Sequence, residues 1–303
     1  MNQSFYDKLT SVIAKERVYV DEPMSRHTTF RVGGPADFFV TPKAKEEVRD
    51  VIRICKEAGM PYYIIGNGSN LLVSDAGYRG VIVQIYKEMN EVKVEGDLVK
   101  AQAGALLSGI AAKALGAELS GFEFASGIPG TIGGACVMNA GAYGGEMKDV
   151  LTEVTVLTPE GTFLTLPVAE LDLSYRHSII PERGYLVVSA VLELHPGKAE
   201  EIRAVMEDLK EKRVSKQPLE YPSAGSTFKR PEGYFAGKLI QDAGLRGFQV
   251  GGAQVSEKHC GFVINRDHAT SADICNLMNQ VSEIVFEKFG VRLEAEVKKI
   301  GEF

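Results

Sequence analysis

Apolar residues recur every three or four positions over residues 45–59, a stretch that stops at Gly59 with Pro61 just beyond. This spacing and this ending predict an amphipathic helix. Further helices are predicted over residues 105–121, 199–218 and 271–290. The 199–218 helix is highly charged and stops before Pro218.

Short apolar runs between these helices predict strands and hairpins. The sequence PYYIIG at residues 61–66 indicates a buried strand that ends in a glycine-rich turn. Other strands or hairpins are expected at residues 81–86, 92–104, 151–167, 185–195, 262–265 and 291–301. Helices and strands alternate without a regular βαβ rhythm, so the pattern favours an α+β fold over a doubly wound sheet.

The character of the chain changes near residue 197, where a charged helix and then a glycine-rich region begin. A chain of 303 residues is also long for a single hydrophobic core. We therefore predict a first domain over residues 1–197, with subdomains of roughly 1–85 and 86–197, and a second domain over residues 198–303.

The composition, with 45% hydrophobic and 24% charged residues, is typical of a soluble globular protein. No apolar run reaches the roughly 18 residues of a membrane span, and the N-terminal stretch does not resemble a secretory signal. Four scattered cysteines without a C-x-x-C pair favour a reducing cytoplasm and no structural metal. A net charge of −6 argues against nucleic-acid binding, so an anionic ligand needs a local cationic cluster.

Two glycine-rich segments suggest a site for a phosphate-bearing cofactor. IGNGSNLLVSD at residues 65–75 follows a predicted strand, and residues 126–146 contain seven glycines. Glycine lets backbone N–H groups converge on a pyrophosphate without a side chain in the way. Neither segment has the G-x-G-x-x-G or G-K-[ST] pattern of standard nicotinamide and Walker sites. Tight-turn packing would explain one segment alone, whereas two in one half favour a large cofactor.

The stretch YPSAGSTFKRP at residues 221–231 places Ser226 on a glycine-backed bend beside Lys229 and Arg230. It lacks the G-x-S-x-G elbow of a hydrolase, so a serine nucleophile is not indicated. A turn serine with a local hydrogen bond is the simplest interpretation of Ser226 taken alone. The cations nearby, with Arg213 and Lys216, form either an anion site or a solvated helix end.

These motifs, together with SYRHS (174–178), AGSTFKRP (224–231), residues 237–265 and LEAEVKKIG (293–301), resemble the UDP-N-acetylenolpyruvoylglucosamine reductase family in the same order along nearly the whole chain. The resemblance implies an FAD-binding domain of the vanillyl-alcohol oxidase/p-cresol methylhydroxylase type, built of two α/β subdomains. A smaller C-terminal α/β substrate-binding domain would follow. The chain would belong to the short class, which lacks an extra loop with a tyrosine.

The resemblance implies an enzyme with noncovalent FAD, and we expect this enzyme to be cytoplasmic and monomeric. NADPH delivers hydride to flavin N5, the reduced flavin passes it to C3 of UDP-N-acetylglucosamine enolpyruvate, and a proton reaches C2. The product, UDP-N-acetylmuramate, is a peptidoglycan precursor. Ser226 matches the proton donor, Arg176 the residue that stabilises the enolate, and Glu296 the residue that orients or polarises the enolpyruvyl group. Glu294, on the same face of the predicted strand, competes with Glu296.

The resemblance also implies binding residues. Flavin contacts are expected from the two glycine-rich segments, at Gly66, Asn67, Gly68, Ser69, Asn70, Gly127, Ile128, Pro129, Gly130, Thr131, Gly133, Gly134, Asn139, Ala140 and Gly141. Arg213 and Lys298 are expected at the N1–C2=O edge of the flavin, where positive charge stabilises its reduced anion. Tyr175, Lys216 and Arg230 are expected to contact the nucleotide sugar. Cys136 is expected to be a buried packing residue rather than a flavin attachment point.

Three rival functions stay open at this point. The nearest is a sugar or alcohol oxidase with the same flavin fold, which would leave the Ser226 stretch unexplained. A flavin-binding regulatory protein without turnover would have no need of Arg176, Ser226 and Glu296 together. A serine hydrolase ranks last, because Ser226 has no evident histidine and aspartate partners.

Overall fold

The computed structural model describes residues 2–303, which fall into two compact units, each assembled from separate stretches of the chain. One unit comprises the chain up to Tyr19, Phe39–Asn67 and Ile82–Arg213. The other comprises Val20–Phe38, Gly68–Val81 and Val214–Phe303. The mixture of helices and antiparallel sheets in each unit confirms the predicted α+β class.

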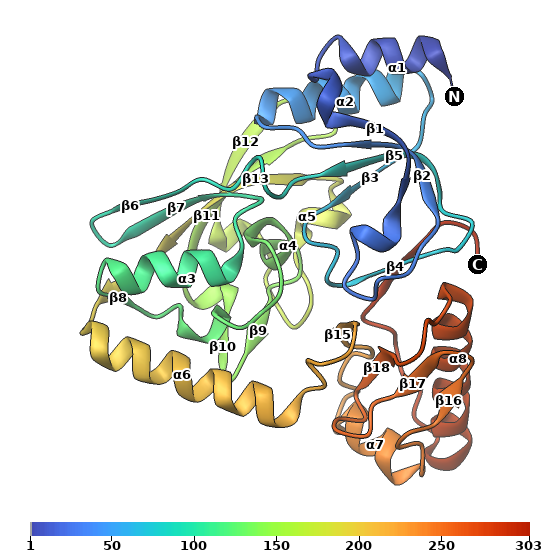
Figure 1. The fold of residues 1–303 in the computed structure, drawn as a ribbon. Helices are drawn as coiled ribbons and strands as arrows, with labels where there is room; N and C mark the ends of the chain where they lie inside the picture. Colours follow the sequence, from blue (N-terminus) through green and yellow to red (C-terminus); the bar gives the residue numbers. More distant parts are fainter. Residues whose placement is uncertain (1) are drawn as a thin grey trace. The chain divides into compact units, whose positions relative to one another are not determined.

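A five-stranded antiparallel sheet forms the centre of the first unit (Figure 1). Its order is β12-β11-β13-β7-β6, with bounds Phe163–Pro167, Leu151–Leu157, Leu186–Glu193, Leu98–Gln102 and Val92–Glu95. In β11, Val154 pairs with Leu166 on one side and with Ala190 on the other. Both predicted hairpins, at 92–104 and 151–167, are therefore confirmed.

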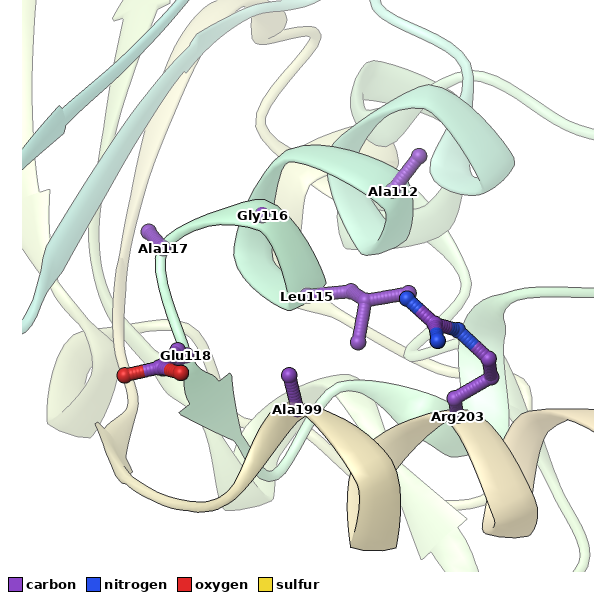
Figure 2. Close-up of a pocket in the computed structure, with 7 residues that line it drawn as sticks. All are labelled: Ala112, Leu115, Gly116, Ala117, Glu118, Ala199 and Arg203. Carbon is purple, nitrogen blue, oxygen red and sulfur yellow. The ribbon is translucent and has the colours of Figure 1, made fainter.

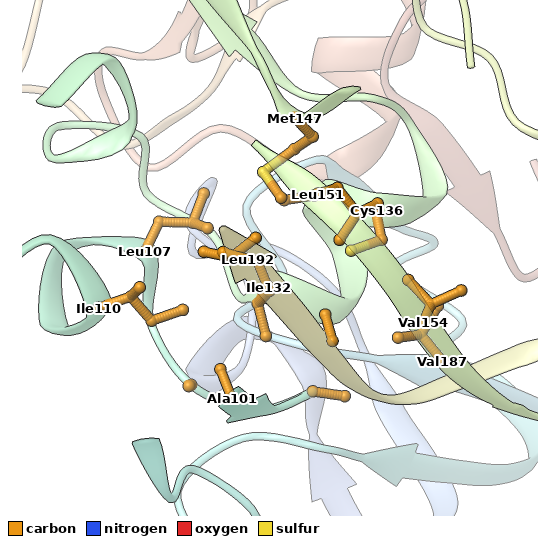
Figure 3. Close-up of a cluster of buried hydrophobic side chains, with 14 of the residues drawn as sticks. Ala101, Leu107, Ile110, Ile132, Cys136, Met147, Leu151, Val154, Val187 and Leu192 are labelled. Atoms are coloured by element: carbon orange, nitrogen blue, oxygen red, sulfur yellow. The ribbon is translucent and has the colours of Figure 1, made fainter. Parts of the chain in front are cut away.

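The core of this unit lies between the sheet and the helices α3 (Leu107–Gly116) and α4 (Ile132–Val137). Figure 3 shows Ile110, Ile132, Cys136, Val154 and Leu192 pointing into one cluster, and all five side chains are buried. The burial of Cys136 raises the pKa of its thiol to about 12. Cys136 is therefore a neutral packing residue, as the sequence predicted.

The first unit contains further helices and strands. They are α1 (Gln3–Thr10), α2 (Lys45–Glu57), β3 (Tyr62–Ile65), β8 (Leu119–Ser120), β9 (Gly141–Ala142), β10 (Gly145–Glu146), α5 (Ile179–Glu182), β14 (His195–Pro196) and α6 (Ala199–Lys216), whose last three residues belong to the second unit. The 3₁₀ turns of the chain are Lys15–Arg17, Met24–Arg26, Glu123–Ala125, Met147–Asp149 and Val168–Glu170. A four-stranded sheet has the order β1-β2-β5-β3, and the chain passes between units within β1 (Val18–Pro23), β2 (Pro35–Val40) and β5 (Tyr78–Gln84).

The second unit packs a four-stranded sheet against a long helix, α8 (Ser271–Phe289). The sheet has the order β15-β18-β17-β16, with bounds Ser223–Ser226, Phe262–Asn265, Ala253–Val255 and Gln249–Val250. Helix α7 (Ala236–Asp242) contributes to the same core. A parallel pair, β4 (Leu71–Val73) with β19 (Lys298–Ile300), joins the C-terminal segment to the residues after the first glycine-rich turn.

Helix α8 begins with two kinds of cap. Thr270 and Asp273 form a capping box, and the carboxylate of Asp75 accepts hydrogen bonds from the Ser271 and Ala272 backbone N–H groups at 2.8 and 3.1 Å. A carboxylate at this end satisfies N–H groups that have no partner within the helix and complements the helix dipole. The distant residue Asp75 therefore stabilises the start of α8.

We expect Asp75→Ala to lower the free energy of unfolding by about 1 kcal/mol, because two N–H groups at the start of α8 lose a charged acceptor. Urea unfolding followed by circular dichroism measures the change. Asp267→Ala, which removes an exposed aspartate from the same unit, is the matched control. Equal stability of the two variants would contradict the capping role of Asp75.

The predicted strand over residues 291–301 is wrong in its extent. Only Lys298–Ile300 form a strand, and the preceding residues are irregular apart from one bridge between Ala295 and Phe228. Glu294 and Glu296 therefore do not share a strand face. Helix α4 was also missed, because six residues with two glycines give little helical pattern. The domain boundary at residues 197–198 stays a prediction.

Candidate active site

The two predicted glycine-rich segments contact each other within the first unit. Gly66, at the end of β3, approaches Thr131 so closely that a Cβ on Gly66 would lie 2.3 Å from Thr131 Oγ1. The neighbouring Asn67 donates from Nδ2 to the Pro129 carbonyl at 3.5 Å. Only glycine permits this close approach at residue 66. The two segments therefore lie directly against each other and form one continuous surface.

A cavity of about 400 Å³ in the first unit opens onto this surface. Its lining includes Gly66, Thr131, Gly133 and Gly134, opposite apolar and aromatic side chains such as Tyr62. A Cβ added to Gly134 would find one neighbour, Thr131 Oγ1, at 3.8 Å. The cavity therefore combines backbone polar groups and apolar walls, as cofactor sites do.

A second hollow, of about 510 Å³, is open to solvent between α3 and α6 (Figure 2). Figure 2 shows that Leu115, Glu118 and Arg203 supply its larger side chains and that small residues supply the rest. None of the residues predicted to bind cofactor or substrate lines this hollow. The 400 Å³ cavity is therefore the better candidate for a cofactor.

Asn139 has a structural role that the sequence did not reveal. Its side chain is 1% exposed, donates to Glu146 Oε2 at 2.7 Å and to the Ser174 carbonyl at 3.1 Å, and accepts from the Lys148 N–H at 2.9 Å. Asn139 thus ties the end of the second glycine-rich segment to the residue before Tyr175. Its predicted flavin contact stays a prediction.

Tyr175 and Arg176 form the tip of a tight turn in the first unit. Ser174 and His177 close this turn with a pair of backbone hydrogen bonds at 3.2 and 3.3 Å. Arg176 has a φ of +55°, which is unusual for a residue with a side chain, and its guanidinium lies 5.1 Å from the Tyr175 ring centre. The turn therefore holds a cation and an aromatic ring together in a strained backbone, a feature common at functional sites.

Arg213, in α6, lies against the second glycine-rich segment. A Cβ on Gly127 would lie 2.7 Å from Arg213 Nε, and the Arg213 guanidinium lies 5.9 Å from the Tyr143 ring centre. Burial lowers the pKa of the Arg213 guanidinium from its ordinary value. A partly buried cation beside a candidate cofactor segment is well placed to stabilise a bound anion.

The second unit brings Ser226 and Glu296 together. Ser226 ends β15, and the next residue, Thr227, accepts a hydrogen bond from the Glu296 N–H at 2.9 Å through its carbonyl. Thr227 is fully buried, and its Oγ1 accepts from the Val263 N–H at 2.9 Å. Thr227 therefore fixes both Ser226 and Glu296 to the sheet, a role that no sequence motif indicated.

Glu294 is held away from this arrangement. Its carboxylate lies 2.5 Å from Lys229 Nζ, and the Lys229 N–H donates to its carbonyl at 2.8 Å. The Glu294 side chain is 72% exposed, so this pair contributes little to stability. An ion-paired, solvated Glu294 favours Glu296 as the acidic residue of the site.

The other predicted residues of the second unit lie near the ends of its elements. Arg230 places its guanidinium 4.0 Å from the Phe235 ring centre, and its Nε donates to the Tyr234 carbonyl at 3.3 Å. Lys216 ends α6, and Lys298 begins β19 with an exposed side chain. Asn70 bonds to the backbone on both sides of Val297, donating to the Glu296 carbonyl at 3.1 Å and accepting from the Lys298 N–H at 3.0 Å. In all, the second unit contains Gly68, Ser69, Asn70, Lys216, Ser226, Arg230, Glu296 and Lys298.

Comparison with known proteins supports a cofactor site in the first unit. Residues 36–167 match the model of an FAD binding domain, and residues 217–300 match that of the UDP-N-acetylenolpyruvoylglucosamine reductase C-terminal domain. A p-cresol methylhydroxylase with substrate bound has a similar structure, with a TM-score of 0.50 and 15% identity over 97% of this chain and 65% of that chain. The matched domains and the fold therefore indicate an FAD-binding protein with the p-cresol methylhydroxylase fold.

Relatives that align over the full length of this chain identify its family. The UDP-N-acetylenolpyruvoylglucosamine reductase of Agathobacter rectalis is 56% identical over 315 residues and covers 100% of both chains. That of Clostridioides difficile is 51% identical over 301 residues, 99% of each chain. The crystal structure of the Thermus caldophilus reductase has a TM-score of 0.80 and 35% identity, over 94% of this chain and 98% of that one. The chain belongs to the UDP-N-acetylenolpyruvoylglucosamine reductase family, and the oxidase alternative is not favoured.

Proposed function

We propose that this chain is an NADP-dependent UDP-N-acetylmuramate dehydrogenase, which reduces UDP-N-acetylglucosamine enolpyruvate with FAD as cofactor and NADPH as reductant. Family membership over the full chain supports this function. The structural observation that supports it best is the hydrogen bond from the Glu296 N–H to the Thr227 carbonyl. This bond keeps Ser226, the residue before Thr227, close to Glu296 along the backbone. The product would supply peptidoglycan synthesis.

The residues of the first unit fit FAD. The cavity beside Gly66, Thr131 and Gly134 offers backbone polar groups to a pyrophosphate and apolar walls to the rest of the nucleotide. Arg213 adds a partly buried cation beside Gly127. Cys136 is buried with a neutral thiol, which supports noncovalent binding. FAD held there would supply a hydride carrier between NADPH and the vinyl C3 of the substrate.

The side chains of this protein would stabilise the negative charge that develops on the substrate and supply the proton that C2 receives. Arg176 stabilises the negative charge that develops over C2 and the substrate carboxylate, since a guanidinium matches two carboxylate oxygens at once. The Ser226 hydroxyl delivers a proton to C2, and Glu296 orients the enolpyruvyl group. We propose that Tyr175, Lys216 and Arg230 bind the UDP part and that Lys298 stabilises the reduced flavin.

We further propose that the enzyme acts as a monomer in the cytoplasm and belongs to the short class of its family. No helix within residues 2–303 is both long and apolar enough to cross a membrane. The division into an FAD-binding domain over residues 1–197 and a substrate-binding domain over residues 198–303 is part of the same proposal.

Gly134→Ala is expected to weaken FAD binding by about tenfold or more, since an extra methyl in a filled site costs about 1–3 kcal/mol. In the apoprotein the new Cβ meets one atom, at 3.8 Å, so thermal stability should not fall. Fluorescence titration of apoprotein with FAD measures the dissociation constant. Gly109→Ala, on helix α3, is the control and should leave FAD binding unchanged. Unchanged affinity in Gly134→Ala would argue against FAD in this cavity.

A product assay tests the proposed function. The protein loaded with FAD is incubated with NADPH and the enolpyruvyl substrate without oxygen, and the product is analysed by mass spectrometry. We expect a product heavier than the substrate by two hydrogen atoms, with one deuterium at C2 when the reaction runs in D₂O. Substrate recovered unchanged, with NADPH consumed only in air, would contradict the proposal.

A further inference from the structure

Glu296 is held by its backbone although it lies outside any helix or strand. Its N–H donates to the Thr227 carbonyl at 2.9 Å, and its carbonyl accepts from Asn70 Nδ2 at 3.1 Å. The carbonyl of Asn70 accepts from the Lys298 N–H at 3.0 Å. Asn70 therefore bonds to both ends of the Glu296–Lys298 segment, once through its side chain and once through its backbone.

The two bonds of Asn70 have different consequences. The backbone bond to Lys298 continues the parallel pairing of β4 with β19, which any residue at position 70 would keep. The side-chain bond is specific, because it fixes the peptide that follows Glu296 and needs a donor on residue 70. Without this bond, the peptide that follows Glu296 loses the hydrogen bond that Asn70 supplies, and it can turn about the Thr227 bond.

We propose that Asn70 is a positioning residue for Glu296, acting through the Glu296 carbonyl. This inference rests on the proposed function, in which the Glu296 carboxyl orients the enolpyruvyl group. A displacement of about 1 Å at such a group can reduce a rate about 100-fold. The side-chain amide of Asn70 would thus serve the transfer to substrate, a role different from the flavin contact that the family resemblance implies for Asn70.

Asn70→Ala tests this role in the FAD-loaded enzyme. We expect an unchanged dissociation constant for FAD and an unchanged rate of flavin reduction by NADPH. Reoxidation of the flavin by the enolpyruvyl substrate, followed anaerobically by stopped-flow absorbance, should be about 10- to 100-fold slower. Asn70→Asp keeps the size of the side chain but removes its N–H donor. This variant should show the same slowing, and it replaces the alanine variant if the latter folds poorly.

Asn265→Ala is the matched control. Asn265 lies in the same unit, donates from Nδ2 to the Phe30 carbonyl at 3.1 Å and accepts from the Ala269 N–H at 2.8 Å. The Asn265→Ala substitution therefore removes the same kind of hydrogen bond from a side chain to the backbone, but neither of its partners is Glu296. We expect this variant to lose stability but to keep the wild-type rate of reoxidation.

A double-mutant cycle with Glu296→Gln distinguishes an Asn70 that acts through Glu296 from an Asn70 that affects the rate independently of Glu296. If Asn70 acts through Glu296, Asn70→Ala should cause no further slowing in the Glu296→Gln background. Independent, multiplicative slowing, or a large rise in the dissociation constant for FAD, would overturn the inference while leaving the proposed function intact. A wild-type flavin that the substrate cannot reoxidise would overturn the proposed function and this inference with it.

Discussion

Replacing Ser226 by alanine is expected to slow reoxidation of the flavin by the enolpyruvyl substrate by about 10²–10⁴-fold, the usual contribution of a positioned proton donor. Reduction of the flavin by NADPH should keep its wild-type rate, because no proton is delivered to C2 in that half-reaction. Anaerobic stopped-flow absorbance measures both rates in one preparation. The effect is confined to one half-reaction, which distinguishes a lost proton donor from a damaged fold.

Ser223→Ala is the control for this prediction. Ser223 lies in the same strand, β15, and pairs with Ile264 as Ser226 pairs with Phe262. Its substitution should change neither half-reaction. Equal slowing of both half-reactions in Ser226→Ala would remove the proton-donor role from Ser226 and leave it as a structural residue.

Arg176→Ala is expected to slow reoxidation by substrate about 10²–10³-fold, the range seen when one group that stabilises a developing oxyanion is removed. The strained backbone of Arg176 adds a second expectation. Once the guanidinium is gone, the turn no longer has to keep a φ of +55° at residue 176. Relaxation of the turn should therefore change the stability of the variant but should not restore its activity. Stopped-flow rates and urea unfolding, measured together, separate the two effects.

Arg183→Ala, an exposed arginine of the same unit, is the matched control for the loss of one positive charge. It should leave both half-reactions unchanged. If Arg176→Lys restored the full rate, a general positive charge would suffice, and the two-oxygen recognition proposed for the guanidinium would be wrong.

Local patterns predicted the regular elements well. Helix α8 was predicted within one residue at its C-terminal end, because Gly290 provides a left-handed cap after an amphipathic stretch. The hairpins β6–β7 and β11–β12 were predicted because their residues alternate and turn within a short distance. Such features depend on neighbours in the sequence, and the sequence contains them.

The irregular segment around Glu296 was not predictable in the same way. Its partners, Asn70, Thr227 and Phe228, are distant in the sequence, and alternating residues suggested a longer strand than the chain forms. Asn139 illustrates the same limit, because a polar residue in a glycine-rich segment gives no sign that its bonds go to Ser174 and Glu146. Motif resemblance identified the candidate residues, and only the structure revealed what holds them.

The visible absorbance of the FAD-loaded protein, recorded without oxygen, distinguishes a reductase from an oxidase when NADPH is added first and one equivalent of UDP-N-acetylglucosamine enolpyruvate second. For the proposed reductase, we expect NADPH to bleach the flavin bands and the enolpyruvyl substrate to restore them. Bands that stay bleached with substrate and return only when air is admitted would contradict this expectation.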